Sequence, residues 1–342
     1  MNAAIFRRHG GPDVLEYTDV PEPRIGSGEV LIRVKACSVN HLDLWIRQGL
    51  PAYRISLPHI SGCDVAGIIE RLGPGVITCS IGDRVVLAPG LSCGECAWCQ
   101  AGHDNLCATY GIRGAATDGG YAEFALARAR DVLPMPARLS FEEAAAYPLV
   151  FLTAWHMLVT RAKLQAGERV LVHAAGSGIG HAAIQIATHL NARVCTTVGS
   201  DAKTPKAIAL GAERAINYQR ENFETQMKEW TEGRGVDVVF EHVGPATWES
   251  SVRVLAKGGR LVTCGATSGP SVTLDLRYLF SRQLSLFGSM MGTRAELEAV
   301  TRLIGQQQLK PVVDAAIPLR EARAAQERLL KREVFGKLVL VP

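Results

Sequence analysis

The sequence contains no uncharged apolar run long enough to cross a bilayer, so no segment is expected to be a transmembrane helix. Its first residues, MNAAIFRRHGG, lack the apolar core of a secretory signal peptide. The formal net charge of +4 is small and dispersed, and it does not indicate nucleic-acid binding. There is no internal repeat and no low-complexity segment. We therefore expect a cytoplasmic protein that binds neither membrane nor nucleic acid.

The remaining composition is that of an intracellular enzyme. The 342 residues are enough for two domains of ordinary size, and 47% of them are hydrophobic, which suits a substantial core. Nine cysteines are present, and their scatter is not the pattern of a secreted disulfide framework. Five of them are interpreted as reduced thiols: Cys37, Cys63, Cys79, Cys195 and Cys264.

The other four cysteines form the most informative motif of the chain. Cys93, Cys96, Cys99 and Cys107 follow the pattern C-x2-C-x2-C-x7-C, and Gly94 permits a tight turn between them. Four thiolates complete a tetrahedral shell for Zn²⁺ with no position left for substrate. The spacing predicts one structural Zn²⁺ per chain; a disulfide pair or buried free thiols are the alternatives.

The first 130 residues have the rhythm of a β-rich domain. Apolar, β-prone segments at 30–36, 62–69 and 82–87 are separated by Gly and Pro. The pattern changes after Leu139. Ser140 and Glu143 form a capping-box signature, which predicts a helical stretch that runs on toward Ala162.

Strands and helices then alternate. Expected strands lie at 169–173, 193–198, 236–240 and 259–264, and expected helices at 182–190 and 203–210. This alternation predicts a parallel sheet covered on both faces. Beyond residue 296 we expect a helix, a charged helix over 320–331 and a last strand over 337–341.

The first strand of the alternating region leads into a small-residue loop that ends in a helix. Such a turn lets the backbone approach a pyrophosphate at a helix N-terminus. The strict G-x-G-x-x-G pattern is not met, and a tight turn without ligand is the alternative, but the strand–loop–helix context favours a dinucleotide site. The predicted loop residues are Ala175, Gly176, Ser177, Gly178, Ile179 and Gly180.

The end of the next strand distinguishes the two nicotinamide cofactors. An acidic residue at this position would bind the ribose 2′-OH of NADH. Here Gly199 and Ser200 follow the strand, and Lys203 lies within reach of a 2′-phosphate. We therefore predict NADPH rather than NADH. Asp201 supports the opposite interpretation, and Lys203 as a solvated lysine at a helix start is a further alternative.

Together these motifs resemble the medium-chain dehydrogenase/reductase superfamily, which includes zinc alcohol dehydrogenases and quinone oxidoreductases. The resemblance covers essentially the whole chain. It implies an α/β fold with a GroES-like β-rich catalytic domain at 1–136, which carries the zinc lobe at about 90–110. It also implies a doubly wound Rossmann domain at 137–295 and a C-terminal segment, 296–342, that returns to the catalytic domain. Further markers are 39–43, 62–67, 82–85, 119–123, 152–155, 209–212 and 336–337.

The chain departs from the alcohol dehydrogenases where these hold a second, catalytic zinc. The resemblance places Asn40, Cys63 and Leu149 at the three ligand positions, with Asp64 beside them. It therefore implies the zinc-independent quinone oxidoreductase branch, with the structural lobe retained. An atypical catalytic zinc is the alternative, because ligand types lie close together in sequence: Cys37, His41, Asp43, His59, Cys63 and Asp64.

Without a Lewis acid, a quinone or α,β-unsaturated carbonyl is a better hydride acceptor than a simple ketone. Asn40 is the candidate donor to the developing enolate, and Tyr53 is the candidate proton donor. Asp43 orients Asn40 or a water, or is a structural carboxylate bonded to backbone. Cys63 is expected to line the pocket and not to act as a nucleophile, because no base is paired with it.

The resemblance also implies further cofactor contacts and a self-association. The strand expected at 284–289 would pair across a two-fold axis in a homodimer or homotetramer. The leading hypothesis is an NADPH-dependent reductase of quinones, enones or other carbonyls. The alternatives are an alcohol dehydrogenase with an atypical zinc and a cofactor-binding relative without turnover. The further predicted cofactor residues are Thr153, Tyr218, Val243, Gly244, Gly265, Ala266, Phe287 and Lys337.

Overall fold

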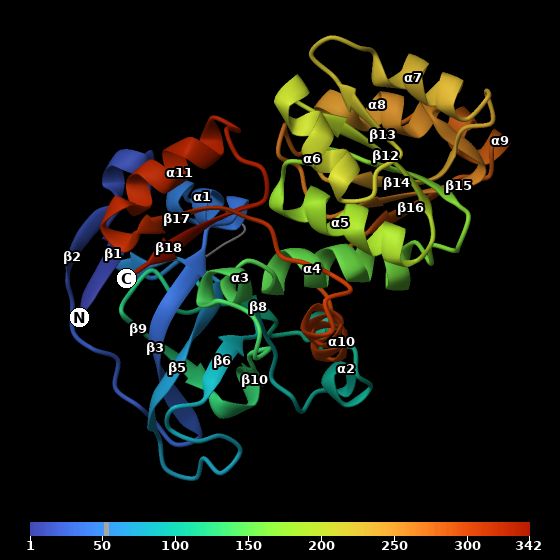
Figure 1. The fold of residues 1–342 in the computed structure, drawn as a ribbon. Helices are drawn as coiled ribbons and strands as arrows, with labels where there is room; N and C mark the ends of the chain where they lie inside the picture. Colours follow the sequence, from blue (N-terminus) through green and yellow to red (C-terminus); the bar gives the residue numbers. More distant parts are fainter. Residues whose placement is uncertain (51–54) are drawn as a thin grey trace. The chain divides into compact units, whose positions relative to one another are not determined.

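The computed structural model describes residues 1–50 and 55–342, which form two compact units (Figure 1). The first unit holds residues 1–149, 293–307 and 311–342, and the second holds 150–292 and 308–310. The domain boundaries predicted above, after residues 136 and 295, differ from the divisions after residues 149 and 292 and stay a prediction. No helix among the described residues has both the length and the apolar character that a membrane crossing needs.

The first unit is built around a mixed sheet in the order β10-β6-β5-β3-β18-β17, with β9 also paired to β3. Its strands are β3 (Glu29–Ser38), β5 (Asp64–Leu72), β6 (Arg84–Leu87), β9 (Phe124–Arg128), β10 (Val132–Pro134), β17 (Val313–Pro318) and β18 (Lys337–Val341). A smaller sheet, β2-β1-β4, and the pair β7-β8 complete the unit. These are β1 (Asn2–Phe6), β2 (Glu16–Asp19), β4 (His59–Ile60), β7 (Gly90–Leu91) and β8 (Gly111–Ile112).

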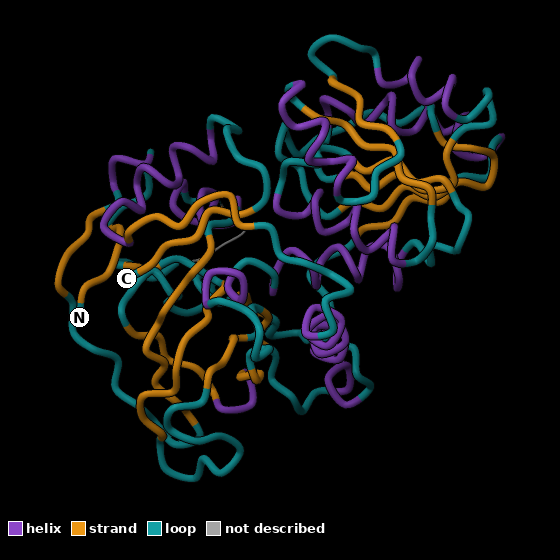
Figure 2. Tube along the Cα trace, viewed as in Figure 1, coloured by secondary structure: helices purple, strands orange, loops and turns teal. Residues whose placement is uncertain are grey.

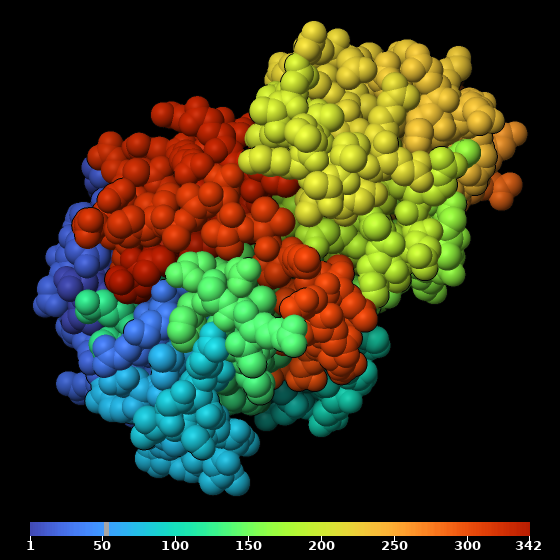
Figure 3. Space-filling view, in the orientation of Figure 1, coloured from blue at the N-terminus to red at the C-terminus, as the bar shows by residue number. Residues whose placement is uncertain are grey.

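The register of this sheet joins distant parts of the chain. Ser38 lies opposite Asp64 in the antiparallel pair β3–β5, and it lies opposite Val339 in the pair β18–β3. The C-terminal strand therefore packs beside the N-terminal ones, and Figure 3 shows the C-terminal residues, in red, against residues coloured blue and green. Buried side chains of β3, β5 and β18, among them Ile32, Val65 and Leu338, form one core cluster that holds this register.

In the described part of the first unit, the chain also forms several helices. They are α1 (His41–Gln48), α2 (Ala97–Gln100), α3 (Phe141–Ala145), α10 (Arg294–Gly305) and α11 (Ala322–Leu330). Ser140 caps α3 as expected: its hydroxyl accepts from the Glu143 N–H, and the Glu143 carboxylate accepts from the Ser140 N–H. The predicted run toward Ala162 is not one helix. It breaks at Ala146–Tyr147, because Pro148 disfavours a helical residue before it, and resumes as α4 (Pro148–Trp155) and a π-helical turn, His156–Arg161.

The second unit is the predicted doubly wound parallel sheet. Its order is β13-β12-β11-β14-β15-β16, and Figure 2 shows helices on both of its faces. The strands are β11 (Arg169–Val172), β12 (Arg193–Val198), β13 (Arg214–Asn217), β14 (Val236–Glu241), β15 (Leu255–Thr263) and β16 (Ser285–Gly288). The helices are α5 (Gly178–His189), α6 (Thr204–Ala209), α7 (Phe223–Trp230), α8 (Pro245–Arg253) and α9 (Leu276–Ser281). The predicted α/β fold, a β-rich domain together with a doubly wound parallel-sheet domain, is confirmed by this strand order.

Candidate functional site

A buried polar network fills the place where the resemblance puts a catalytic metal. Its centre is Asp64, at the start of β5, whose side chain is fully buried. One carboxylate oxygen accepts from the N–H of Leu149 at 2.8 Å. The other accepts from the Ser38 hydroxyl at 3.0 Å and from the Asn40 side-chain amide at 2.9 Å. The Lys337 ammonium lies 3.4 Å from this second oxygen. Both carboxylate oxygens are therefore already engaged.

Lys337 belongs to this network. Its side chain is 2% exposed, and its ammonium donates to the amide oxygen of Asn40 as well as approaching Asp64. A charge this deeply buried is tolerated only when it is paired and hydrogen-bonded. These contacts do not support the predicted phosphate contact for Lys337, because its ammonium is already committed to Asn40 and Asp64.

Asn40 uses both ends of its amide within the same network. Its amide nitrogen donates to Asp64 at 2.9 Å and to the sulfur of Cys63 at 3.3 Å. A thiol sulfur is a weak acceptor, so the N–H directed at Cys63 is the one that a better acceptor can redirect. The lysine bond to the amide oxygen polarises the amide and strengthens its N–H groups as donors. Asn40 is 6% exposed, slightly more than its charged neighbours.

Asp43 has the contacts of a structural carboxylate. It lies in the first turn of α1 and accepts from the N–H of Asn40 at 2.7 Å, from the N–H of Gly62 at 3.1 Å and from the Tyr121 hydroxyl at 2.9 Å. Burial raises its pKa to about 6. Of the two roles predicted for Asp43, these contacts favour the structural one. Tyr121 was not predicted as its partner.

Cys63 is a buried thiol. Burial raises its pKa well above the ordinary value, and the nearby carboxylates of Asp64 and Asp43 raise it further. A thiol in this state is a poor nucleophile. Tyr53, the predicted proton donor, lies outside the described residues.

The cysteine quartet has the geometry that zinc requires. A tetrahedron of Zn–S bonds of about 2.3 Å separates the sulfurs by about 3.8 Å. The observed separations are 3.8 Å for Cys93–Cys99, 3.5 Å for Cys96–Cys99 and 3.5 Å for Cys93–Cys107. Among the residues that the structure describes, these four are the only set of three or more Cys, His, Asp or Glu whose ligand atoms converge, all within 4.8 Å.

Two features prepare this lobe for a cation. Gly94 has a φ of +79°, and a Cβ there would meet the Arg130 guanidinium at 2.5 Å. The Cys107 sulfur accepts from the Thr109 hydroxyl at 3.4 Å and from the Cys93 N–H at 3.3 Å. These bonds lower the pKa of Cys107 to about 6, so a thiolate is favoured there.

In the second unit, the small-residue loop runs from β11 into α5. The Ser177 hydroxyl accepts from the Gly180 N–H at 2.9 Å, which caps the helix. A Cβ on Gly180 would meet the carbonyl oxygen of Ala174 at 2.2 Å, so only glycine fits. Ala174 adopts a φ of +53°, and its N–H donates to Thr197 on the neighbouring strand. The helix starts at Gly178, four residues before the predicted start.

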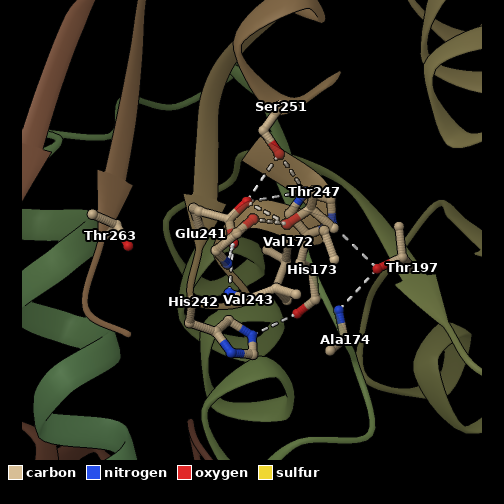
Figure 4. A network of polar contacts seen from close by, with 12 residues as sticks. Val172, His173, Ala174, Thr197, Glu241, His242, Val243, Thr247, Ser251 and Thr263 are labelled. Atoms are coloured by element: carbon tan, nitrogen blue, oxygen red, sulfur yellow. Dashed lines mark hydrogen bonds and ion pairs between the residues drawn. The ribbon is translucent and has the colours of Figure 1, made fainter. Parts of the chain in front are cut away.

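Beneath this loop lies a buried network that the sequence analysis missed (Figure 4). His173 lies 2.9 Å from the Ser251 hydroxyl, which donates to Glu241 at 2.9 Å. The other Glu241 oxygen accepts from the N–H groups of Val243 at 2.5 Å and Gly244 at 3.0 Å. Burial lowers the pKa of His173 to about 4, so its ring is neutral at pH 7 and Glu241 carries the charge. Glu241 thus fixes two predicted cofactor residues, Val243 and Gly244.

The residues predicted to bind the adenosine end of the cofactor lie close together. A Cβ on Gly199 would meet the Tyr218 hydroxyl at 2.7 Å, so the two residues pack together. The Asp201 carboxylate accepts from the side chains of Asn217 and Arg220, each at 2.6 Å. These bonds lower the pKa of Asp201. The carboxylate that favoured NADH is therefore already paired.

The other predicted cofactor residues lie near the carboxyl ends of β14 and β15 or close to β16. A Cβ on Gly265, just past β15, would meet the His242 carbonyl at 3.0 Å. The Thr153 hydroxyl lies 3.9 Å from the Met291 sulfur, and Arg161 stacks on the Phe287 ring at 5.5 Å. Because parallel strands end at one edge of a sheet, the loops at Ala175, Gly199, Gly244 and Gly265–Ala266 share that edge.

Comparison with known proteins agrees with both units. A family profile described as alcohol dehydrogenase GroES-like domain matches residues 26–137, and one described as zinc-binding dehydrogenase matches 178–306. An alcohol dehydrogenase of Geobacillus stearothermophilus is 34% identical over 343 residues, 99% of each chain. A quinone oxidoreductase of Rattus norvegicus is 32% identical over 349 residues, 100% of this chain and 98% of the other. A crystal structure of an NAD-dependent alcohol dehydrogenase matches with a TM-score of 0.96 and 43% identity over the whole of both chains.

Proposed function

Because the chain belongs to the medium-chain dehydrogenase/reductase family of zinc-type alcohol dehydrogenases and quinone oxidoreductases, it is an NAD(P)-dependent oxidoreductase, and we propose that it reduces quinones or α,β-unsaturated carbonyls with NADPH and without a catalytic metal. The observation that carries the proposal is the network around Asp64. Asn40, Cys63 and Leu149 supply one amide, one high-pKa thiol and one aliphatic side chain where a metal would need three ligands. Lys337 already supplies a cation there.

The chemistry follows from these residues. NADPH, when bound, supplies the hydride that adds to the conjugated carbon of the substrate. Negative charge then develops on the substrate oxygen, and a positioned N–H donor stabilises it. Asn40 provides that donor through the N–H that points at the Cys63 sulfur, a weak acceptor that the substrate oxygen would replace, while Lys337 holds its amide oxygen in place. Tyr53 stays the predicted proton donor to the substrate.

The cofactor and the metal are assigned to separate parts of the chain. The loop from Ala175 to Gly180 would hold the pyrophosphate, because its close packing requires glycine and its helix N-terminus favours anions. The paired state of Asp201 supports NADPH over NADH, with Lys203 near the 2′-phosphate. One Zn²⁺ per chain would sit in the cysteine quartet and hold the lobe together.

The oligomeric state of the protein and its location in the cell stay predictions. Strand β16 pairs with β15 on one side, and it is the last strand in the order of the six-stranded sheet. A strand at the edge of a sheet can pair with a copy of itself, and we propose a homodimer or homotetramer formed there. The expected location is the cytoplasm.

The proposal is tested by assaying NADPH oxidation against a quinone, an enone and an aldehyde, before and after treatment with a chelator. We expect turnover of the quinone or enone that survives chelation, together with a zinc content near one per chain. A zinc content near two and an alcohol or aldehyde activity that the chelator abolishes would overturn it. That outcome would support the second candidate, a zinc alcohol dehydrogenase, which the names of two similar proteins favour.

A further inference from the structure

His242 lies where the strand order of the second unit's sheet reverses direction. The order is β13-β12-β11-β14-β15-β16, so the chain proceeds from β11 toward one edge of the sheet and from β14 toward the other. Ligands of a doubly wound sheet bind outside the carboxyl ends of the strands at this reversal. Strand β14 ends at Glu241, and His242 is the next residue. Its position alone therefore makes it a candidate for contact with the cofactor.

One nitrogen of the His242 ring is fixed by the backbone (Figure 4). Its Nε2 lies 2.9 Å from the carbonyl oxygen of His173. A carbonyl oxygen only accepts hydrogen bonds, so Nε2 carries a proton and donates it. Burial lowers the pKa of His242, which keeps the ring neutral at pH 7. In a neutral ring with its proton on Nε2, the other nitrogen, Nδ1, carries only a lone pair and is an acceptor.

Nδ1 of His242 is an acceptor without a partner in the described part of the chain. The residue is partly exposed, and Nδ1 does not belong to the fully buried side-chain atoms that lack a hydrogen bond. It therefore keeps surface that a small polar group can reach. The ring is also held in place, because the buried Phe240 ring lies against it with the centroids 6.0 Å apart. An accessible acceptor with a fixed tautomer and a fixed orientation suits a donor group on a ligand.

The order of the strands indicates which part of the cofactor lies beside His242. The predicted adenosine residue Gly199 follows β12, the proposed pyrophosphate loop follows β11, and His242 follows β14. Neighbouring strands are about 4.8 Å apart, so His242 lies about one strand spacing beyond the pyrophosphate loop. A Cβ on Gly265, a residue predicted to contact the cofactor, would lie 3.5 Å from the His242 Cβ. The group that follows the pyrophosphate in the cofactor is the nicotinamide ribose.

We propose that Nδ1 of His242 accepts a hydrogen bond from a hydroxyl group of the nicotinamide ribose. The ribose hydroxyls are donors, whereas phosphate oxygens at pH 7 chiefly accept, so the pyrophosphate does not fit Nδ1. The inference rests on the cofactor site proposed above and adds to it a side chain whose role the sequence did not indicate. The bond anchors the half of the cofactor that carries the hydride.

The test uses the zinc-loaded, full-length protein and three probes: NADPH, 2′-phospho-ADP-ribose and 2′-phospho-ADP. The second lacks the nicotinamide, and the third lacks the adjoining ribose as well. His242→Gln keeps a donor at the distance of Nε2 and has no acceptor in the place of Nδ1. In calorimetric titrations this variant should bind NADPH and 2′-phospho-ADP-ribose about 5- to 10-fold more weakly, and 2′-phospho-ADP within about two-fold of the wild type, because one hydrogen bond to the ribose is lost.

Two further variants separate this contact from the bond to His173. His242→Asn can place its amide oxygen at the distance of Nδ1, and it should bind the first two probes more tightly than His242→Gln does. His189→Gln, a partly exposed histidine at the other end of α5, should leave all three affinities within about two-fold. If His242→Gln does not fold, His242→Phe keeps a ring beside Phe240, removes both nitrogens and should give the same pattern across the probes.

Three results would overturn the proposal: an unchanged affinity for NADPH, an equal loss for 2′-phospho-ADP, or a loss for NADPH that 2′-phospho-ADP-ribose does not share. The second would indicate general damage to the loop, and the third would move the donor to the nicotinamide carboxamide. If the wild type prefers NADH, then NADH, ADP-ribose and ADP replace the three probes. None of these results bears on which carbonyl compound is reduced or on a second zinc, so the two proposals fail separately.

Discussion

The ammonium of Lys337 donates a hydrogen bond to the amide oxygen of Asn40, although the two residues are 297 positions apart in the chain. The pairing of β18 with β3 brings them together, since Val339 lies opposite Ser38. The C-terminal strand therefore completes the candidate active site as well as the sheet. Two of the predictions below follow from this contact and from its neighbours Asp64 and Asp43.

Lys337→Met should destabilise the protein strongly. The substitution removes the ammonium and leaves the Asp64 carboxylate buried without its cation. Breaking a buried ion pair in this way costs about 3–5 kcal/mol. Urea unfolding measures the change in the free energy of unfolding. Lys331→Met, at an exposed position on the same C-terminal segment, should change it by less than about 0.5 kcal/mol. Adding Asp64→Asn to Lys337→Met should recover part of the loss. Equal stability of the Lys337 and Lys331 variants would show that the pair contributes nothing.

The contrast between Lys337 and the cysteine quartet shows what sequence can reveal. The quartet is local: four ligands within fifteen positions and a glycine at the turn specify the site without knowledge of the fold. The capping box at Ser140 and Glu143 is local in the same way. Lys337 reaches its partners through strand register, which depends on the whole sheet. Glu241 and His173 were missed for the same reason, because Ser251 joins them from a helix that follows β14.

Sequence reasoning also placed some element ends wrongly for physical reasons. Helix α5 was expected to begin at Ala182. The Ser177 cap and the tight packing of Gly180 against Ala174 start it at Gly178 instead, although glycine has a low helix propensity. The prediction of one helical stretch toward Ala162 did not take Pro148 into account. A proline disfavours the helical conformation at the residue before it, and the structure has a break there.

Cys96→Ser should release the metal and loosen the lobe. A structural Zn²⁺ contributes on the order of 10 kcal/mol to small zinc peptides, and three thiolates cannot replace the closed shell. We expect zinc per chain, measured by mass spectrometry, to fall from about one to below about 0.2, together with a lower melting temperature. Cys79→Ser, a cysteine outside the quartet, is the matched control and should keep its zinc. Unchanged zinc and melting temperature in Cys96→Ser would refute the metal site.

Asp43 should make the protein less stable as the pH rises from about 4 to about 6. Burial raises its folded-state pKa to about 6 from 3.8, so in this window the folded protein holds a proton that the unfolded chain has lost. The stabilisation is therefore fully present below the unfolded pKa and is lost as the pH passes the folded one. The difference of about two pKa units corresponds to about 3 kcal/mol.

Urea unfolding across this pH range checks the sign. Asp43→Asn cannot titrate and should flatten the slope, even though the variant is less stable overall because it loses an acceptor. Glu333→Gln, at an exposed position, should keep the slope of the wild type. A wild-type stability that increases with pH through this window, and that Asp43→Asn leaves unchanged in slope, would contradict the assignment.

Glu241→Ala should weaken NADPH binding without touching the proposed cofactor contacts directly. It removes the acceptor of the Val243 and Gly244 N–H groups and of the Ser251 hydroxyl, so that loop loses its anchor. We expect about a 10-fold increase in the dissociation constant of NADPH, followed by cofactor fluorescence. Glu249→Ala, on the exposed face of the adjoining helix, should leave it within about two-fold. An unchanged dissociation constant in a folded Glu241→Ala variant would separate this network from cofactor binding.

The preference between NADPH and NADH provides the last prediction. If Lys203 contacts the 2′-phosphate, Lys203→Ala should raise the dissociation constant of NADPH about 10-fold and leave that of NADH within about two-fold, since only NADPH carries the phosphate. Lys206→Ala, one helical turn further along, is the matched control and should change neither.

The Asp201–Arg220 ion pair also affects the affinity for NADPH. Arg220→Gln would leave Asp201 without its cation, and NADPH should then bind more weakly because an unpaired carboxylate repels the phosphate. Equal affinity of the wild type for the two cofactors, or a Lys203→Ala variant that weakens both alike, would remove the case for NADPH and return Asp201 to the role of a ribose ligand.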